Sequence, residues 1–152
     1  MDTKIEVLIE KMEQARLRLN TALEKLAPQS EIYPTWQVKQ LLDHITGWDE
    51  LVIATLHIYE KGVSPERSVK SIDQYNVGSI SNRQALSIDQ SRHAYDTARQ
   101  EVLKILQGLP AGSLSQEFKA PWGGKCTIPN MLKIFISHEE EHARHIEKLI
   151  EA

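Results

Sequence analysis

The run His138-Glu139-Glu140-Glu141-His142-Ala143-Arg144-His145 carries the most information about the fold. An α-helix has 3.6 residues per turn, so residues separated by four and then by three positions lie on the same face. The three histidines of the run have this spacing, and Met131, Phe135 and Leu149 continue it on either side. Because this spacing is typical of a helix face that packs into a core, histidines stand here where hydrophobic side chains are expected.

Buried imidazoles need partners, because taking a polar group out of water without a hydrogen bond costs free energy. A transition-metal ion is a well-matched partner for several neutral ring nitrogens that converge. One helix cannot surround an ion, and His44 is the candidate from a second helix, since it lies on an apolar face one turn before Trp48. We therefore predict a metal site formed by His44, His138 and His142, with His145 as a candidate fourth ligand or a residue that supports the ligands.

Three imidazoles leave coordination positions open for water or substrate, as in catalytic metal sites. Zinc, nickel, iron and manganese all accept imidazole ligands, so each of these divalent ions is compatible with the ligand set. A site with two ions is disfavoured, because the Glu-x-x-His element of di-iron bundles, present at residues 139–142, has no second copy. The alternative interpretation is that the histidines are bonded to one another or to water in a core or cleft.

Residues 138–142 also match the H-E-x-x-H motif, in which two histidines bind zinc and the glutamate activates water. The extended form of this motif in metalloproteases has Gly and His at the positions where this chain has His145 and Lys148. The context therefore argues against a protease. Glu139 is a candidate base, or an acceptor that supports the histidines.

The composition favours one domain over residues 1–152, because this length buries a core without disulfides. Cys126 is the only cysteine, and the first residues lack a signal-peptide pattern, so we expect a cytoplasmic protein and a loop cysteine rather than a nucleophile. No apolar run approaches the roughly 20 residues that cross a bilayer. The net charge is −3, and the basic residues are not clustered in one segment, so the sequence argues against nucleic-acid binding.

Apolar residues at helical spacing predict four helices, each marked by start and stop signals. The first helix has a capping pattern at Thr3–Glu6 and a stop signal at Pro28, and the second has an N-cap at Thr35 and a stop signal at Gly62. The third has a capping box at Ser81–Gln84 and a stop signal at Gly108, and the fourth has a cap at Thr127. On the second helix the inner face is expected to extend to Ile58. Residues 63–82 show no period and are expected to be a connection. Trp122-Gly123-Gly124 predicts a turn in a short hairpin.

Four helices with inward apolar faces predict an all-α four-helix bundle. The first two helices are joined by a short link and should be antiparallel. The connection between the second and third, at residues 63–82, is long enough to cross the length of the bundle. Such a crossover permits an up-down-down-up order.

Two segments resemble the DinB/YfiT-like superfamily of metal-binding four-helix bundles. Residues 36–45 are similar to the family pattern W-x-x-K-x-L-L-x-H, which opens the second helix, and residues 138–146 are similar to its C-terminal H-x-x-x-H. The resemblance covers residues 36–150 and implies an up-down-down-up bundle with His44, His138 and His142 as metal ligands. Family members often carry Gln where this chain has His145. Residues 44–48 and 72–76 also resemble the ClbS/DfsB-like branch, which is associated with self-protection against reactive natural products.

The resemblance implies a bacterial enzyme, and some relatives use a low-molecular-weight thiol such as bacillithiol, mycothiol or glutathione. Our hypothesis is a metal-dependent enzyme that transfers a thiol to a small electrophilic substrate or hydrolyses that substrate. Trp48 and Trp122 are candidate walls of the cleft for substrate or cofactor, with core packing as the alternative. Two other hypotheses stay open: a non-catalytic bundle that binds or shields a small molecule, and a homodimer whose assembly is its function.

Overall fold

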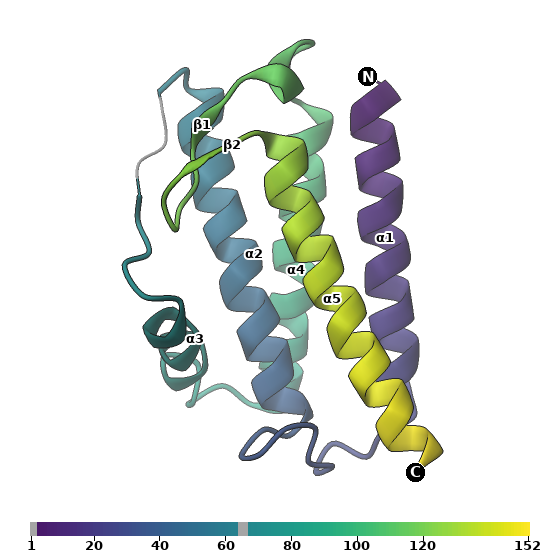
Figure 1. The fold of residues 1–152 in the computed structure, drawn as a ribbon. Helices are drawn as coiled ribbons and strands as arrows, with labels where there is room; N and C mark the ends of the chain where they lie inside the picture. Colours follow the sequence, from purple (N-terminus) through teal and green to yellow (C-terminus); the bar gives the residue numbers. More distant parts are fainter. Residues whose placement is uncertain (1–2, 64–66) are drawn as a thin grey trace.

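The computed structural model describes residues 3–63 and 67–152, and most of these residues are helical. Four long helices form the predicted bundle: α1 (Thr3–Glu24), α2 (Val38–Glu60), α4 (Ile88–Gln107) and α5 (Ile128–Glu151). A shorter helix, α3 (Ile72–Ser81), packs against α2 on the outside of the bundle (Figure 1). Within the described ranges, no helix is both long and apolar enough to cross a membrane.

The order of the helices is up-down-down-up. Helices α1 and α5 run in one direction and pack against each other, whereas α2 and α4 form a second pair that runs in the opposite direction (Figure 1). The chain between α2 and α4 therefore returns along the length of the bundle, as predicted. In this antiparallel pairing of α2 and α5, His44 in the second turn of α2 lies level with His138 and His142 near the middle of α5.

The start of α2 differs from the prediction. Thr35 has a φ of 70°, which belongs to a turn, and Gln37 is the N-cap, in a capping box with Gln40. The inner face also ends earlier than expected, because Ile58 is 41% exposed. Leu56, which is fully buried, takes the last inward position instead.

The prediction of an irregular connection at residues 63–82 is wrong in part, because helix α3 occupies residues 72–81. The Ser71 hydroxyl caps it by accepting the backbone N–H of Gln74. The predicted capping box at Ser81–Gln84 is wrong for the same reason, since Ser81 is the last residue of α3. The identical S-x-x-Q pattern at Ser87 and Gln90 caps α4.

The predicted start of the first helix is also shifted. Thr3 already lies within α1, and the residues before it are outside the described part of the chain. The cap at Thr127 is confirmed, because its hydroxyl accepts the backbone N–H of Asn130 at the start of α5. At the other end of α5, Leu149 is 37% exposed and so does not continue the buried face.

The predicted hairpin is present between α4 and α5. After a single 3₁₀ turn, η1 (Ser113–Ser115), strand β1 (Phe118–Lys119) pairs antiparallel with β2 (Lys125–Cys126). Gly123 and Gly124 in the turn have φ values of 100° and 82°, a left-handed backbone that favours glycine. The hairpin lies beside α2 and the start of α5 (Figure 1), and its turn contains Trp122.

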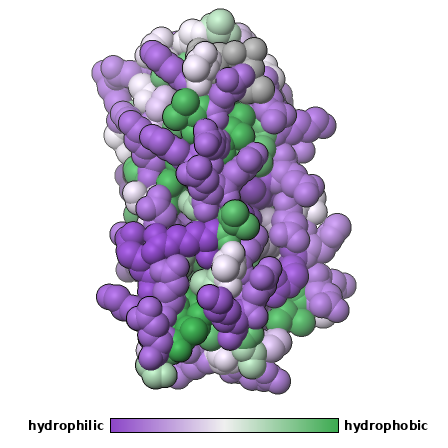
Figure 2. Space-filling view, turned by 90° about the vertical axis from the view of Figure 1, so that its right-hand side faces the viewer, coloured by the Kyte–Doolittle hydropathy of each residue, from purple (hydrophilic) through white to green (hydrophobic). Residues whose placement is uncertain are grey.

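Hydrophobic side chains from all four long helices fill the core in two clusters, one toward each end of the bundle. The face of the molecule on the α1 side is mostly hydrophilic, with apolar side chains in separate areas (Figure 2). Between α2 and α3 the backbones approach closely at Gly47, where an added Cβ would lie 2.2 Å from the Ser79 hydroxyl oxygen. This contact fixes α3 against the middle of α2, three residues beyond His44.

Candidate metal centre

The three histidines predicted as metal ligands converge in the structure. His44 comes from α2, and His138 and His142 come from successive turns of α5. The Nε2 atom of His138 lies 3.2 Å from Nε2 of His44 and 2.9 Å from Nε2 of His142. Ligand atoms of all three residues lie within 4.8 Å of one another, so they form a group that could hold a metal ion.

These spacings fit a small transition-metal ion. An ion bound tetrahedrally at about 2.0–2.1 Å from each nitrogen separates neighbouring ligand atoms by about 3.3 Å. The observed Nε2 separations of 2.9 and 3.2 Å are close to this value. Nε2 of His138 faces two other ring nitrogens but carries at most one proton, so it can donate only one hydrogen bond. An ion between the three nitrogens accepts a lone pair from each of them and therefore suits this arrangement better.

Burial keeps the three rings neutral, which is the state that binds metals. Burial, with a contribution from the positive form of neighbouring histidines, lowers the pKa of His44 and of His142 to about 3. Burial also lowers the pKa of His138, although Glu141 and Glu139 partly oppose it. At neutral pH, no proton has to be displaced from these rings before an ion binds.

Tyr33, in the loop between α1 and α2, orients His142. Its hydroxyl lies 2.7 Å from Nδ1 of His142. Burial raises the pKa of Tyr33, so the phenol stays protonated. When the Nε2 lone pair of His142 faces an ion, the ring proton is on Nδ1 and is donated to the phenol oxygen, the arrangement that typically supports a ligating histidine.

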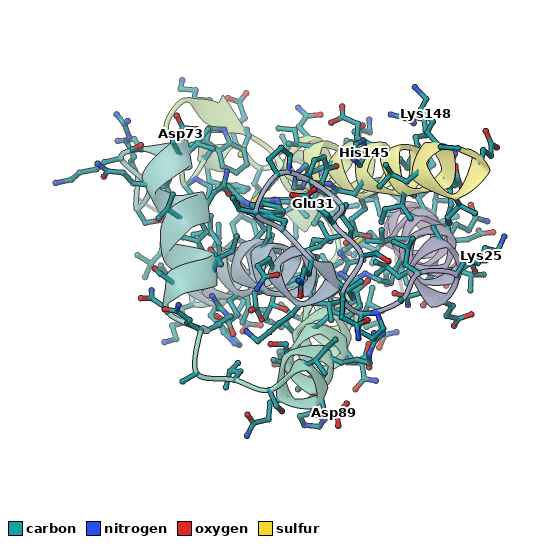
Figure 3. The ribbon with its side chains drawn as sticks, turned by 90° about the horizontal axis from the view of Figure 1, so that it is seen from below. Lys25, Glu31, Asp73, Asp89, His145 and Lys148 are labelled. Carbon is teal, nitrogen blue, oxygen red and sulfur yellow. The ribbon has the colours of Figure 1, made fainter. Side chains whose placement is uncertain are left out.

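His145 lies beside the site but has other partners. Its Nε2 atom is 2.6 Å from the backbone carbonyl oxygen of Ile32, and its ring stacks on Tyr33 with centroids 4.2 Å apart. Viewed from below, it lies next to the loop that joins α1 and α2 (Figure 3). Of the two predicted roles, this position favours support of the ligands, because His145 holds the loop that carries Tyr33.

His44 is held by packing. Its ring lies against Trp36, with centroids 4.9 Å apart. Its Nδ1 atom is buried and has no hydrogen-bond partner within the described part of the chain. The ring of His44 is therefore positioned by packing rather than by a hydrogen bond to Nδ1.

Glu139 lies in a buried group of four charged residues, one from each long helix. The four residues are Arg16 of α1, Asp49 of α2, Arg99 of α4 and Glu139 of α5. A carboxylate oxygen of Glu139 accepts a hydrogen bond from Arg16 at 2.8 Å and another from Arg99. Arg16 and Arg99 also donate to the two carboxylate oxygens of Asp49, at 2.9 and 3.1 Å.

Within this group the formal charges cancel, which is what makes ionised side chains tolerable in a core. Burial works against ionisation of Glu139, but Arg99 and Arg16 outweigh it and hold the pKa of this carboxyl below its usual value. Because Glu139 follows His138 directly in α5, the ion pairs that hold Glu139 also fix the position of α5 along the bundle axis next to the histidines. A role for Glu139 as a base stays a prediction.

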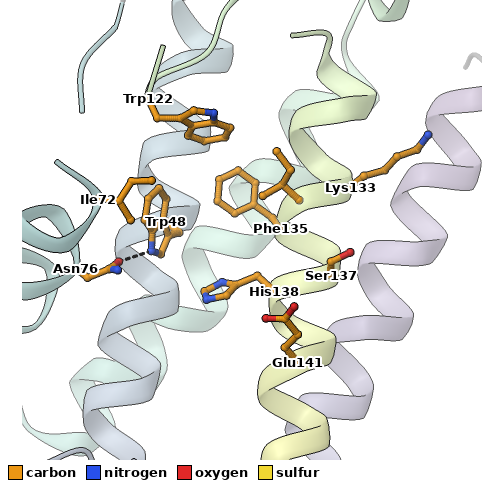
Figure 4. Close-up of a pocket in the computed structure, with 10 residues that line it drawn as sticks. Trp48, Ile72, Asn76, Trp122, Lys133, Phe135, Ser137, His138 and Glu141 are labelled. Carbon is orange, nitrogen blue, oxygen red and sulfur yellow. Dashed lines mark hydrogen bonds between the residues drawn. The ribbon is translucent and has the colours of Figure 1, made fainter. Parts of the chain in front are cut away.

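A pocket of about 600 Å³ opens on the half-buried His138. Trp48 and Trp122, predicted as cleft walls, both line it, together with Phe135 and Asn76 (Figure 4). Cys126 is outside this lining, and burial raises its pKa, which disfavours a reactive thiolate. Through His138, the group of three histidines thus borders a pocket large enough for a small organic molecule.

Sequence reasoning missed Tyr33, the contact of Trp36 with His44, and the buried charges. Tyr33 is in a loop without a period, so no pattern marks it. Arg16 and Arg99 each follow an alanine on an apolar face, at Ala15 and Ala98. A charge at such a position is the signal that could have suggested a buried pair.

A sequence model of the DinB superfamily matches residues 3–146, nearly the whole chain. The chain belongs to the DinB superfamily. No curated protein matches it closely enough in sequence to count as a relative. The predicted resemblance to this family is thereby confirmed, whereas the finer resemblance to the ClbS/DfsB-like branch is not specifically supported.

Solved structures share the fold of this DinB chain. A mycothiol-dependent maleylpyruvate isomerase superposes with a TM-score of 0.77 at 13% identity, over 93% of this chain and 60% of the isomerase. YfiT from Bacillus subtilis, described as a probable metal-dependent hydrolase with an unusual four-helix bundle topology, superposes with a TM-score of 0.71 at 15% identity, over 98% of this chain and 87% of YfiT. At these identities the likeness establishes the fold, and the chain spans about 60% of the length of the isomerase.

Proposed function

We propose that this DinB protein is a metal-dependent enzyme that acts on a small electrophilic substrate at His44, His138 and His142, by transfer of a thiol or by hydrolysis. One observation carries the proposal: three neutral ring nitrogens converge beside a pocket lined by aromatic side chains. A divalent ion held by them would lower the pKa of a bound water or thiol and polarise the substrate. Zinc, nickel, iron and manganese are the candidate ions.

Each part of the site has a separate task in this proposal. Buried His44 and His142 present neutral nitrogens, and Tyr33 keeps the proton of His142 on Nδ1. His138, the most exposed of the three, lines the pocket and would bring a bound ion to its side. Trp48 and Trp122 hold the apolar body of the substrate and exclude water from the reacting end.

Two similar folds favour two versions of the reaction. The mycothiol-dependent isomerase supports a thiol as co-reactant, and the probable hydrolase supports water. Because both are below 16% identical to this chain, the two versions are tested side by side. The cytoplasm, where low-molecular-weight thiols are kept reduced, is the proposed location.

The test uses protein freed of metal and reloaded with each of the four ions. Thiol transfer is measured with an aryl halide and three thiols, and hydrolysis is measured with an aryl ester. We expect turnover with at least one ion and its loss in His142→Ala. His57→Ala is the matched control, because His57 is an exposed residue of α2 paired with Glu60. Equal turnover in wild type and His142→Ala would contradict the proposal.

The size of the pocket favours a second candidate function, a non-catalytic protein that binds and shields a small molecule. This function, self-protection of the kind associated with the ClbS/DfsB-like branch, needs the pocket but no open coordination position. It predicts binding with one molecule per chain and recovery of the unchanged compound after release. Release of a chemically altered compound would favour the enzyme.

A further inference from the structure

We propose that the pocket selects a neutral, planar aromatic molecule with a carbonyl-type acceptor, and that it discriminates against carboxylates. As a statement about the substrate, this inference rests on the proposed function. As a statement about binding, it concerns only the pocket and can be tested without a metal. Four features of the pocket support it: the aromatic walls, the apolar mouth, one hydrogen-bond donor and the placement of two charges.

Three aromatic rings from three elements form the wall. Trp48 of α2 lies 5.8 Å from Phe135 of α5 and 6.4 Å from Trp122 of the hairpin turn, measured between ring centroids. Trp122 and Phe135 are 5.9 Å apart. The rings are tilted or edge-on to one another, so a planar guest can meet both ring edges and ring faces.

Part of the mouth of the pocket is also apolar, beside the exposed polar side chains Lys133, Ser137 and Glu141. Ile72 of α3 and Ile134 of α5 line it and are 50% and 52% exposed. Exposed large hydrophobic side chains on two sides of one opening leave apolar surface in water that a ligand would cover. The body of the ligand should therefore be apolar at both its inner and its outer end.

Asn76 supplies a hydrogen-bond donor. Its amide oxygen accepts the Trp48 Nε1–H at 2.7 Å, across the contact between α3 and α2 (Figure 4). With one lone pair of the oxygen engaged, the NH₂ group is the donor that Asn76 offers to an acceptor on a ligand. Because Trp48 has its own N–H satisfied, its ring surface acts as an apolar wall.

The two charged residues of the lining are placed differently. The carboxylate of Glu141 lies beside the ring of His138, whereas the side chain of Lys133 extends away from the pocket toward α1 (Figure 4). In the metal-free protein, a ligand carboxylate near His138 would thus face the negative charge of Glu141 without a nearby positive one. Like charges at close range disfavour binding, so the ligand should be neutral at this end.

The test compares two compounds of nearly the same shape, 2-acetylnaphthalene and 2-naphthoate. Their affinities are measured by calorimetry on protein freed of metal, so that the carboxylate cannot bind an ion directly. We expect the ketone to bind at least about tenfold more tightly than the acid. Glu141→Gln should narrow this gap to about threefold or less by strengthening acid binding alone. Glu147→Gln removes the same charge from α5 outside the pocket lining, so it is the matched control and should leave both affinities unchanged.

Trp122→Ala tests the aromatic wall. Since Trp122 is half-buried in a surface hairpin, its removal should leave the bundle folded, which circular dichroism checks, and should weaken ketone binding at least about tenfold. Equal affinity for the two compounds, no binding of either, or unchanged ketone binding in Trp122→Ala would overturn the inference. Failure of the turnover assay with normal selectivity here would reject the proposed reaction but not the pocket.

Discussion

The Nδ1 atom of His142 lies 2.7 Å from the hydroxyl oxygen of Tyr33, whose ring stacks on His145. Through this contact, the loop between α1 and α2 sets the proton position and the ring orientation of a candidate ligand on α5. Its consequence is that metal binding depends on a residue that does not touch the ion.

Tyr33→Phe removes the hydroxyl and keeps the ring. Because a ligating histidine without its outer hydrogen bond is less well oriented, we expect metal affinity to fall by about 10- to 100-fold. Competition with a chromogenic chelator measures the affinity. Tyr59→Phe, which removes a hydroxyl bonded to the Ser113 carbonyl, is the control and should bind metal normally. Equal metal affinity in both variants would remove Tyr33 from the account.

The metal-free protein should lose stability on mild acidification. Burial holds the pKa of His44 and of His142 at about 3 in the folded protein, whereas the unfolded chain regains the ordinary value of 6.5. Between these values the unfolded chain binds more protons, so falling pH favours unfolding. Above about pH 6.5 both rings are neutral in both states and their contribution is constant. Below it, we expect a loss of up to about 1.4 kcal/mol per pH unit for each histidine.

Urea unfolding of the metal-free protein at about pH 7 and about pH 5 measures this loss, in a range above the titration of most carboxyl groups. His44→Asn should make the slope shallower because it removes one titrating ring. His57→Asn, at an exposed position, should leave the slope as it is. The same stability at both pH values would show that the histidines are not buried as neutral rings.

Glu139→Gln should strongly destabilise the fold. Arg16 and Arg99 would keep only Asp49 as an anionic partner, and a buried charge that loses its counter-charge costs about 3–5 kcal/mol. Glu147→Gln breaks the exposed pair with Arg18 and is the matched control, for which we expect no measurable change. Urea unfolding midpoints compare the two. A similar small effect of both variants would mean that the buried group contributes little.

Gly47→Ala should destabilise the protein although alanine favours helices. The new Cβ would lie 2.2 Å from the Ser79 hydroxyl oxygen and 2.6 Å from its Cβ, so α3 would have to move, at a cost of about 1–3 kcal/mol. Gly78→Ala is the control, since its nearest neighbour would be Asn82 at 3.8 Å. A second change, Ser79→Gly, should restore the stability of Gly47→Ala. If Ser79→Gly does not restore stability, the contact between α2 and α3 is not the cause of the destabilisation.

The helical spacing of the sequence predicts much of the bundle and its three histidines, because both follow from one period. His44, His138 and His142 lie on apolar faces, and packing those faces together forces them to converge. The sequence does not predict the short helix α3, because its contact with α2 uses the small residues Ser79 and Gly47 rather than an apolar stripe. The sequence does not predict the role of Tyr33, because this loop residue reaches His142 through tertiary packing alone.

The boundaries were harder to predict where two signals compete. Ser81 and Ser87 carry the same capping pattern, and the local sequence does not show that Ser81 already ends another helix. At Thr35 the residue type favours a cap, but the turn at 33–36 sets its backbone. In both cases, contacts distant in sequence select one of several locally acceptable starts.

The most direct test of the central claim is the metal content of the protein purified without chelators and then offered zinc, nickel, iron and manganese in turn. Elemental analysis, with the anomalous X-ray signal of a crystal to locate the ion, should show close to one ion per chain between His44, His138 and His142. In His138→Ala the content should fall well below one. No bound ion in the wild-type protein, or the same content in His138→Ala, would contradict the account.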